Sequence, residues 1–350
     1  MKADDLFPLV GILASKGNKE NTFRGDSHTF KQLQFLLHNE GGLSFIFTLE
    51  DFHSTYVDGY VFIKGQSKWA KIVLPLPQII YNRLSTRQEE QSTDFQRISK
   101  IAIKKQITIT NPSFFNKWDT YKLLSENEAL KPYLPKTIHY SGEQSLLYML
   151  NTFPAIYFKP HQGSKGKGIY KLSCQKQQYI IIDKTGKRLS LSKANFLRNI
   201  TQLAENEPYL LQEEIHTDTI EGHKYDLRVL CIYNDGIYVI RGIGVRVASA
   251  GRITTHVPNG GSIVPLHLVK DKFDQVQLEW LADKVGKILE KYYGFIGEFS
   301  MDIGIDLFGT PYLFEVNSKP MVFDEEDIQQ PRLHHLVSLF QQKSSINYQK

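Results

Sequence analysis

Two hydrophobic periodicities alternate through the first 112 residues of the chain. Three short apolar runs have the length and the polar boundaries of buried strands: residues 9–15, 43–49 and 78–84. Between the first two runs, apolar side chains recur at helical spacing before Gly41-Gly42, which predicts a helix over residues 28–39. A hairpin is expected over residues 60–77, and a last strand ends at Pro112. Strands that alternate with a helix predict an α/β domain over residues 1–112.

The next segment, residues 113–222, carries helical and strand patterns in turn. Helical spacing predicts three helices, over residues 113–127, 143–153 and 193–206. Apolar runs predict strands over residues 155–160 and 208–215, and Thr185-Gly186 marks the turn of a hairpin. We expect an α+β subdomain over residues 113–222.

The last segment, residues 223–350, is rich in predicted strands. A long hairpin is expected around Asn234-Asp235-Gly236, which is a strong turn sequence. An apolar stripe predicts a helix over residues 273–294, with Gly294 at its C-terminal cap. Two strands over residues 298–317 and a C-terminal helix that contains a proline complete a second α+β subdomain.

The composition excludes some classes of protein but does not indicate a function. The net charge of +5, from 42 basic and 37 acidic residues, is too diffuse to indicate a nucleic-acid partner. The two cysteines, Cys174 and Cys231, have no metal-like spacing and read as small core residues, so we expect a cytoplasmic protein in a reducing compartment. No apolar run approaches the length of a membrane span.

One loop suggests phosphate binding. The sequence FKPHQGSKGKGIYKL, residues 158–172, combines three glycines with four lysines directly after a predicted strand. Glycine lets backbone N–H groups approach an anion, and lysine supplies positive charge. Gly163 and Gly168 have the spacing of a Walker P-loop, but Ile169 and Tyr170 follow where that motif needs Lys and Ser or Thr. The loop therefore indicates a nucleotide held by some other fold.

The hairpin over residues 298–317 suggests a metal site. A four-residue loop from Leu307 to Thr310 would place Asp302 opposite Glu315. Glu315 and Asn317 lie two apart, so they share a face of their strand. The three side chains offer the oxygen ligands that Mg²⁺ prefers. The alternative is a solvated polar face, but the apolar neighbours in YLFEVN favour the metal site.

Five segments in order resemble the ATP-grasp superfamily of carboxylate–amine ligases over residues 113–340. They are NKWDTYKLL, IYFKPHQGSKGKGI, LLQEEI, KYDLRVLCI and MDIGIDLFGTPYLFEVNSKP. The earlier segment LPLPQIIYNRLSTR is similar to the YheC/YheD family of endospore coat-associated ATP-grasp proteins. The resemblance implies a nucleotide between two α+β subdomains, preceded by the N-terminal α/β domain.

The resemblance also implies roles for single residues. Lys117 and Lys159 would contact the nucleotide phosphates, and Asp226 the ribose. The glycine loop would close over the β- and γ-phosphates through Gly163, Ser164, Gly166 and Gly168. The adenine would be read at the hinge by Glu213, Glu214 and Ile215. The metal ligands, for Mg²⁺ or Mn²⁺, would be Asp302, Glu315 and Asn317.

The implied chemistry is activation of a carboxylate by ATP as an acyl phosphate, which an amine or another nucleophile then attacks. Arg228 and Arg246 are the candidates for binding the acyl phosphate or the substrate carboxylate, because guanidinium binds such groups bidentately. The choice between Arg241 and Arg246 stays open. Thr254 stands where related glutamate ligases carry an arginine, close to the glycine turn Gly260-Gly261, so that specificity does not transfer.

Two functions compete. The first is an active ligase that acts on a small-molecule or peptide carboxylate, linked to sporulation. The second is a spore-coat structural or interaction protein that keeps the fold and the nucleotide but has little or no catalysis. Fold alone does not decide between them.

Overall fold

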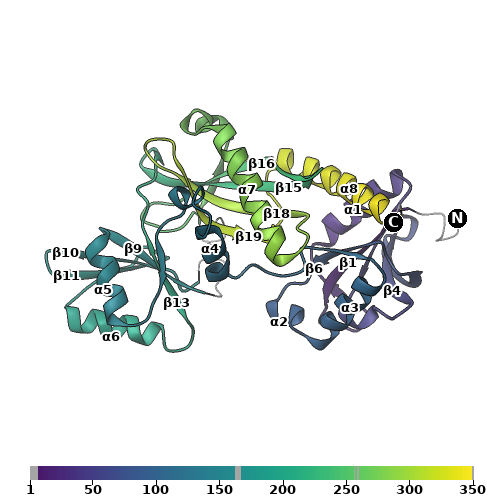
Figure 1. Ribbon diagram of the computed structural model, residues 1–350, viewed down its shortest axis with the longest axis horizontal. Coiled ribbons are helices and arrows are strands. Elements are labelled where there is room, and N and C mark those ends of the chain that lie inside the picture. The colour runs from purple at the N-terminus through teal and green to yellow at the C-terminus, as the bar shows by residue number, and fades with distance from the viewer. Residues whose placement is uncertain (1–6, 162–166, 256, 258–259, 349–350) are drawn as a thin grey trace.

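The computed structural model describes residues 7–161, 167–255, 257 and 260–348, which form three sheets that follow one another along the chain (Figure 1). The architecture is the predicted combination of an α/β unit and two α+β units. The second and third sheets lie side by side, and the first sheet lies beyond the third.

The N-terminal sheet has seven strands in the order β5-β4-β3-β1-β6-β7, with β2 paired to β1. The elements are β1 (Leu9–Lys16), β2 (Phe23–Arg24), α1 (Ser27–Asn39), β3 (Leu43–Phe47), β4 (Tyr56–Ile63), β5 (Lys68–Pro75), β6 (Ile79–Arg83), α2 (Arg87–Glu90), α3 (Thr93–Lys104) and β7 (Thr108–Thr110). The three apolar runs became β1, β3 and β6, which pair in parallel at the centre of the sheet. Helix α3 was not predicted, although Phe95, Ile98 and Ala102 bury one face of it at helical spacing.

The second sheet is antiparallel, in the order β12-β11-β10-β9-β13-β8. Its region comprises α4 (Lys117–Ser125), β8 (Thr137–His139), α5 (Glu143–Thr152), β9 (Ala155–Pro160), β10 (Tyr170–Gln175), β11 (Gln178–Asp183), β12 (Arg188–Leu191), α6 (Lys193–Leu203) and β13 (Tyr209–Glu213). Helices α5 and α6 bury Leu146, Met149 and Phe196 against this sheet. The opposite face is left to meet the third sheet.

The third sheet has the order β17-β16-β15-β18-β19, with β14 paired to β15. Its elements are β14 (Thr219–Ile220), β15 (His223–Asn234), β16 (Ile237–Val247), β17 (Ser262–Val264), α7 (Gln275–Tyr293), β18 (Glu298–Ile305), β19 (Pro311–Asn317) and α8 (Glu326–Tyr348). The predicted turn after β15 has positive φ at Asp235 and Gly236, as a tight hairpin turn needs. Gly294 ends α7 at φ 86°, again as predicted.

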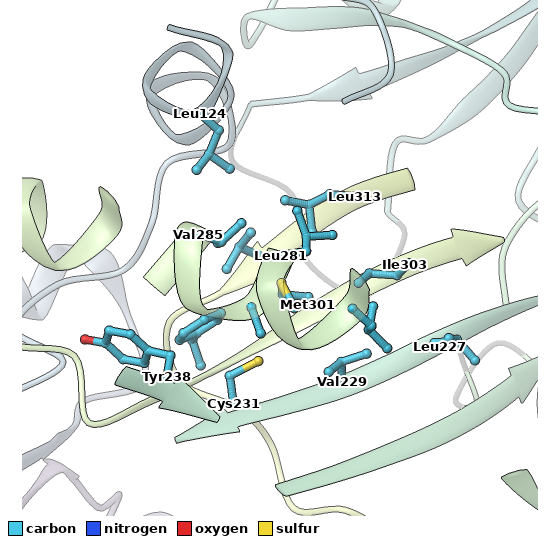
Figure 2. Close-up of a cluster of buried hydrophobic side chains, with 14 of the residues drawn as sticks. Leu124, Leu227, Val229, Cys231, Tyr238, Leu281, Val285, Met301, Ile303 and Leu313 are labelled. Carbon is cyan, nitrogen blue, oxygen red and sulfur yellow. The ribbon is translucent and has the colours of Figure 1, made fainter. Parts of the chain in front are cut away.

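Helix α7 covers one face of the third sheet with the largest core cluster of the protein. Alternate residues of the strands, such as Val229, Cys231 and Met301, are fully buried against α7 (Figure 2). Cys231 is thus a core residue, as predicted. Leu124 of α4 joins the same cluster, so α4 packs on the third sheet, and it also contacts β8 of the second sheet, where the backbone N–H of Thr137 donates to the Tyr121 hydroxyl at 3.1 Å. The division of the chain at residues 112/113 and 222/223 stays a prediction.

The opposite face of the third sheet is shared between the cleft described below and α8. Toward one end, Leu230 and Ile232 of β15 pack with α8 residues such as Leu336 and with Ile12 of β1. This core is common to the N-terminal sheet and the third sheet. It joins the N-terminal unit to the third sheet through α8.

A buried charge network reinforces that junction. The guanidinium of Arg332 on α8 donates from Nε and Nη2 to the two carboxylate oxygens of Glu298, each at 2.7 Å. The hydroxyl of Tyr81 donates to the same carboxylate at 2.5 Å, and Arg83 lies 3.4 Å away. Burial alone would raise the pKa of Glu298, but Arg332 holds it below its usual value. The carboxylate is fully buried and needs these partners to stay ionised.

Candidate nucleotide- and metal-binding site

A cleft of about 1040 Å³, open to solvent, lies where the second and third sheets face each other. It brings together eight of the predicted site residues: Lys159, Glu213, Ile215, Asp226, Arg228, Arg246, Asp302 and Glu315. A smaller adjoining pocket of about 550 Å³ adds Lys117 and shares Lys159, Phe314 and Glu315 with the first. Charged side chains far apart in the sequence therefore meet at two adjoining pockets.

The hairpin of β18 and β19 places the predicted metal ligands on the cleft face. Asp302 pairs with Glu315 and Ser300 pairs with Asn317, as the sequence predicted. The loop itself differs from the prediction. It holds residues 306–310 rather than 307–310, so that Ile305 pairs with Pro311 next to it. A bulge at Phe314 restores the register, so Phe314 and Glu315 both line the cleft.

The oxygen atoms of this group are held by cations. The Nη1 atom of Arg228 lies 2.8 and 3.0 Å from the two carboxylate oxygens of Asp302. The side-chain amide of Asn317 donates to Asp302 Oδ2 at 3.2 Å. The ammonium of Lys117 lies 3.7 Å from Glu315. Arg228 and Lys117 thus offset charge that would otherwise be repulsive between neighbouring carboxylates.

This donor set fits a magnesium ion. Two carboxylates and one amide oxygen are hard ligands, and Mg²⁺ usually keeps further positions for water and phosphate. Within the described residues no three of His, Cys, Asp and Glu gather as a metal-binding group. At Asp302, Glu315 and Asn317 the chain would supply two carboxylates and one amide oxygen, and water or phosphate would fill the other positions of the ion.

Lys159 projects from β9 into the same space. Its ammonium donates to Gln212 on β13 at 2.5 Å and lies 6.0 Å from the centre of the Phe314 ring. Burial lowers the pKa of Lys159 to about 8, and the nearby charge of Lys117 adds to the effect. Two lysines that face a cleft, with no carboxylate in direct contact with Lys159 among the described residues, are arranged to receive an anion.

The two glutamates predicted at the hinge differ in their contacts: Glu214 is paired with lysine side chains, and Glu213 faces the cleft. Glu214 lies 2.7 Å from the ammonium of Lys171 and also accepts from Lys224. These two lysines hold the pKa of Glu214 below its usual value, although burial alone would raise it. Glu213 lines the cleft and accepts from the backbone N–H of Lys136 at 2.8 Å. The contacts of Lys171 and Lys224 with Glu214 were not predicted, because they join segments that are separate in sequence.

Asp226 lies on β15 at the edge of the cleft. Burial raises its pKa to about 6, and a hydrogen bond at 2.5 Å from the hydroxyl of Thr255 partly opposes that rise. The carboxylate is thus a partly buried acceptor, and Thr255 is a donor to it within the described part of the chain. Contact with a ribose stays a prediction for Asp226.

The loop predicted to bind phosphate lies only partly within the described residues. Gly163, Ser164 and Gly166 lie outside the described residues. Gly168 has φ 71°, and a Cβ atom there would come within 2.9 Å of the hydroxyl of Tyr209. Ile169, the next residue, lines the cleft. The described end of the loop is thus placed at the mouth of the cleft.

The arginine candidates separate clearly. Arg228 and Arg246 line the cleft, whereas Arg241 lines a small pocket with His335 on another part of the third sheet. Thr254 also lines the cleft, and its hydroxyl is buried without a hydrogen-bond partner among the described residues. Of the two candidate arginines on β16, Arg246 is therefore the one that lies at the cleft.

Sequence comparisons agree with this geometry. The YheC/D like ATP-grasp family matches residues 106–343. Two proteins of Bacillus subtilis (strain 168) are similar to the chain. The endospore coat-associated protein YheD is 28% identical, over 96% of this chain and 77% of that protein. The endospore coat-associated protein YheC is 24% identical, over 75% of this chain and 76% of that protein.

Solved structures with the same fold include two ligases. D-alanyl-alanine synthetase A from Vibrio cholerae O1 biovar eltor str. N16961 has a TM-score of 0.56 at 12% identity, covering 97% of this chain and 98% of that one. VanG D-Ala:D-Ser ligase from Enterococcus faecalis has a TM-score of 0.54 at 13% identity, covering 95% and 99%. At these identities the likeness establishes the fold.

No helix in the described part of the chain combines the length and the apolar character that a membrane crossing requires. The family match spans both sheets that form the cleft, and the similarity to YheD extends it through the N-terminal sheet. The chain belongs to the YheC/D-like family of ATP-grasp proteins.

Proposed function

We propose that this protein is an ATP- and Mg²⁺-dependent ligase that activates a carboxylate as an acyl phosphate and transfers the acyl group to a nucleophile. The observation that carries the proposal is the meeting of Asp302 and Glu315 with Lys117 and Lys159 at two adjoining pockets, with Asn317 hydrogen-bonded to Asp302. Oxygen ligands for a cation beside lysines for phosphate are the arrangement that holds a metal-bound polyphosphate.

The nucleotide would occupy the cleft between the second and third sheets. Lys117 and Lys159 would bind its phosphates, together with the glycine loop through Gly163, Ser164, Gly166 and Gly168. The base would reach the hinge at Glu213, Glu214 and Ile215, and the ribose Asp226. Because Glu214 is held by two lysines, Glu213 is the better placed acceptor for the exocyclic amine of adenine.

The chemistry requires charge neutralisation and positioning rather than a protein nucleophile. Magnesium, or manganese in its place, would neutralise the phosphates from Asp302, Glu315 and Asn317. Arg228 and Arg246 line the side of the cleft beyond these residues, where a substrate carboxylate would meet guanidinium groups. The N-terminal unit shares a core with α8 and the third sheet and would shape the acceptor pocket.

One assay distinguishes this function from that of a coat protein without catalysis. The full chain is incubated with Mg-ATP, hydroxylamine and a panel of carboxylic acids that includes amino acids and short peptides, and hydroxamate and ADP are measured. An acyl phosphate gives hydroxamate in an amount equal to the ADP released. ATP binding in a thermal-shift measurement without hydroxamate from any acid would instead favour a nucleotide-binding structural role. Association with the spore coat, suggested by the names of YheD and YheC, is a further proposal.

A further inference from the structure

Another pocket lies between the hairpin of β15 and β16 and the C-terminal helix α8, which runs beside these strands (Figure 1). Its volume is about 300 Å³. Strand β15 contributes Tyr233 and Asn234, β16 contributes Arg241, and α8 contributes His335 and Gln342. None of the described residues that line it is acidic, so an arginine faces a hollow that contains no carboxylate.

This pocket is separate from the nucleotide cleft. Asn234 lies six residues beyond Arg228 on β15, which corresponds to about 20 Å of strand. Among the described residues, none lines both this pocket and either pocket of the cleft. A ligand held here would therefore be additional to the nucleotide.

Arg241 is the main cation of the pocket. Its Nε atom is shielded from solvent and has no hydrogen-bond partner among the described residues, and its guanidinium forms no ion pair with them. A guanidinium carries five N–H donors in one plane, and burying a donor without an acceptor costs free energy. An oxyanion in the pocket would supply the acceptors that the chain does not.

A β-bulge places Arg241 in this position. In the pairing of β16 with β15, Arg241 is skipped between Ile240 and Gly242. Gly242 faces α8, since a Cβ atom there would lie 2.4 Å from Ile328. In a regular strand Arg241 would turn to the opposite face, but the bulge leaves both residues on the α8 side. Re-aiming one side chain in this way is typical of bulges beside binding sites.

His335 adds a donor from α8. Its ring is half-buried, and burial lowers the pKa of the imidazole, an effect to which the charges of Arg241 and His334 add. A bound anion would favour the charged imidazole and oppose this shift. Arg241 and His335 therefore gain from the same ligand.

The charges around the pocket favour the same kind of ligand. Lys343 holds its ammonium 4.0 Å from the centre of the Tyr233 ring and 4.1 Å from that of Phe295. Asp235, in the turn of the hairpin, accepts a hydrogen bond from the side-chain amide of Gln342. A second permanent cation thus lies at the pocket wall, while the acid of the turn is already engaged.

We propose that this pocket binds a small oxyanion of the phosphate type, either the phosphate ion or the phosphate group of a small molecule. Donor groups line it from three elements, through Arg241, Asn234 and His335. A tetrahedral oxyanion presents oxygens in several directions and can use all three, whereas a planar carboxylate is satisfied by the guanidinium alone. The inference does not rest on the ligase function.

The test follows the NMR signal of the His335 ring, assigned by comparison with His335→Gln. Inorganic phosphate, sulfate, glycerol phosphate and acetate are titrated into the full chain at constant pH and ionic strength. The signal reports on this pocket, so phosphate that binds in the nucleotide cleft does not interfere. We expect saturable shifts with the three tetrahedral anions and weaker binding of acetate. Tighter binding of phosphate than of glycerol phosphate identifies the free ion as the ligand, and the reverse order identifies a phosphate monoester.

Two variants and one control are measured in the same way. Arg241→Met removes the guanidinium and should raise the Kd for phosphate on the order of 10- to 100-fold, whereas Arg241→Lys keeps the charge without the planar fork and should raise it less. His334→Gln, at an exposed neighbouring position that does not line the pocket, is the matched control and should leave the Kd unchanged. Because the described chain offers Arg241 no partner, Arg241→Met should unfold at the wild-type temperature or above it.

The possible results divide clearly. A Kd for phosphate that rises in the order wild type, Arg241→Lys, Arg241→Met supports the proposal. A His335 signal that does not saturate with any tetrahedral anion overturns it, as does tighter binding of acetate than of phosphate. An unchanged Kd in Arg241→Met also overturns it, and with a lower unfolding temperature it would assign Arg241 a purely structural role. None of these results depends on the outcome of the hydroxamate assay.

Discussion

Lys159 allows a quantitative test of the phosphate site. Burial, with the charge of Lys117, lowers its pKa from 10.5 to about 8. That difference corresponds to about 3 kcal/mol of unfavourable free energy for keeping the ammonium charged in the folded protein. A phosphate group beside it would remove most of this cost, because an anion favours the charged form. We therefore expect Mg-ATP to bind the protonated lysine and to restore its ordinary pKa.

The sign of the pH dependence follows. Below pH 8, Lys159 is protonated in the folded and the unfolded states. The unfavourable free energy of burying its charged ammonium is then present in full. Between about pH 8 and 10.5, the unfolded state binds more protons than the folded state, so the stability of the free protein rises with pH. Over the same pH range, ATP binding is coupled to the uptake of a proton by Lys159. Its Kd should weaken about 30-fold between pH 7 and pH 9.5, for a folded pKa of about 8.

Lys159→Met is the perturbation that isolates this effect. The variant should bind Mg-ATP more weakly at pH 7, and its Kd should no longer depend on pH above 8 through this group. Lys122→Met, at an exposed lysine on α4, serves as the control and should keep the full pH dependence. Isothermal titration at several pH values in two buffers of different protonation enthalpy measures both the Kd and the proton uptake. Equal proton uptake by wild type and Lys159→Met would refute the reasoning.

Three further outcomes are expected. Glu315→Gln should leave the free protein about as stable as before but weaken the Mg²⁺-dependent part of ATP binding by tenfold or more, which titration with and without Mg²⁺ would show. Glu298→Gln should destabilise the fold by about 3–5 kcal/mol in urea unfolding at pH 7, because Arg332 loses its buried counter-charge. Because the pKa of Glu298 is held low, this difference should shrink as the pH falls through that pKa. A fragment of residues 113–350 should fail to unfold cooperatively, since α8 shares its core with the N-terminal sheet.

Local patterns were enough to predict most of the architecture. The buried strands, the turn at Asp235-Gly236 and the cap at Gly294 each depend on residues that are neighbours in sequence. The ordered motifs then placed the cleft residues on facing sheets. The contacts that were not predicted join distant segments, such as Glu214 with Lys171 and Lys224. These ion pairs can be identified only from the tertiary structure, because the sequence alone allows many equivalent pairings between its charged residues.

The metal residues show how a correct prediction can depend on an unpredicted feature. Asp302 opposite Glu315 was inferred from a four-residue loop, whereas the loop holds five residues and shifts the pairing near it by one. Without compensation, that shift would turn Glu315 toward α7, because a one-residue slip moves every side chain to the opposite face. The bulge at Phe314 returns the register, so Leu313 and Val316 both reach the core although they lie three apart. That spacing is visible in YLFEVN, and three is the apolar interval that an odd bulge produces in a strand. The interval between two core residues, rather than the length of the turn, is therefore the better guide to which carboxylates face the cleft.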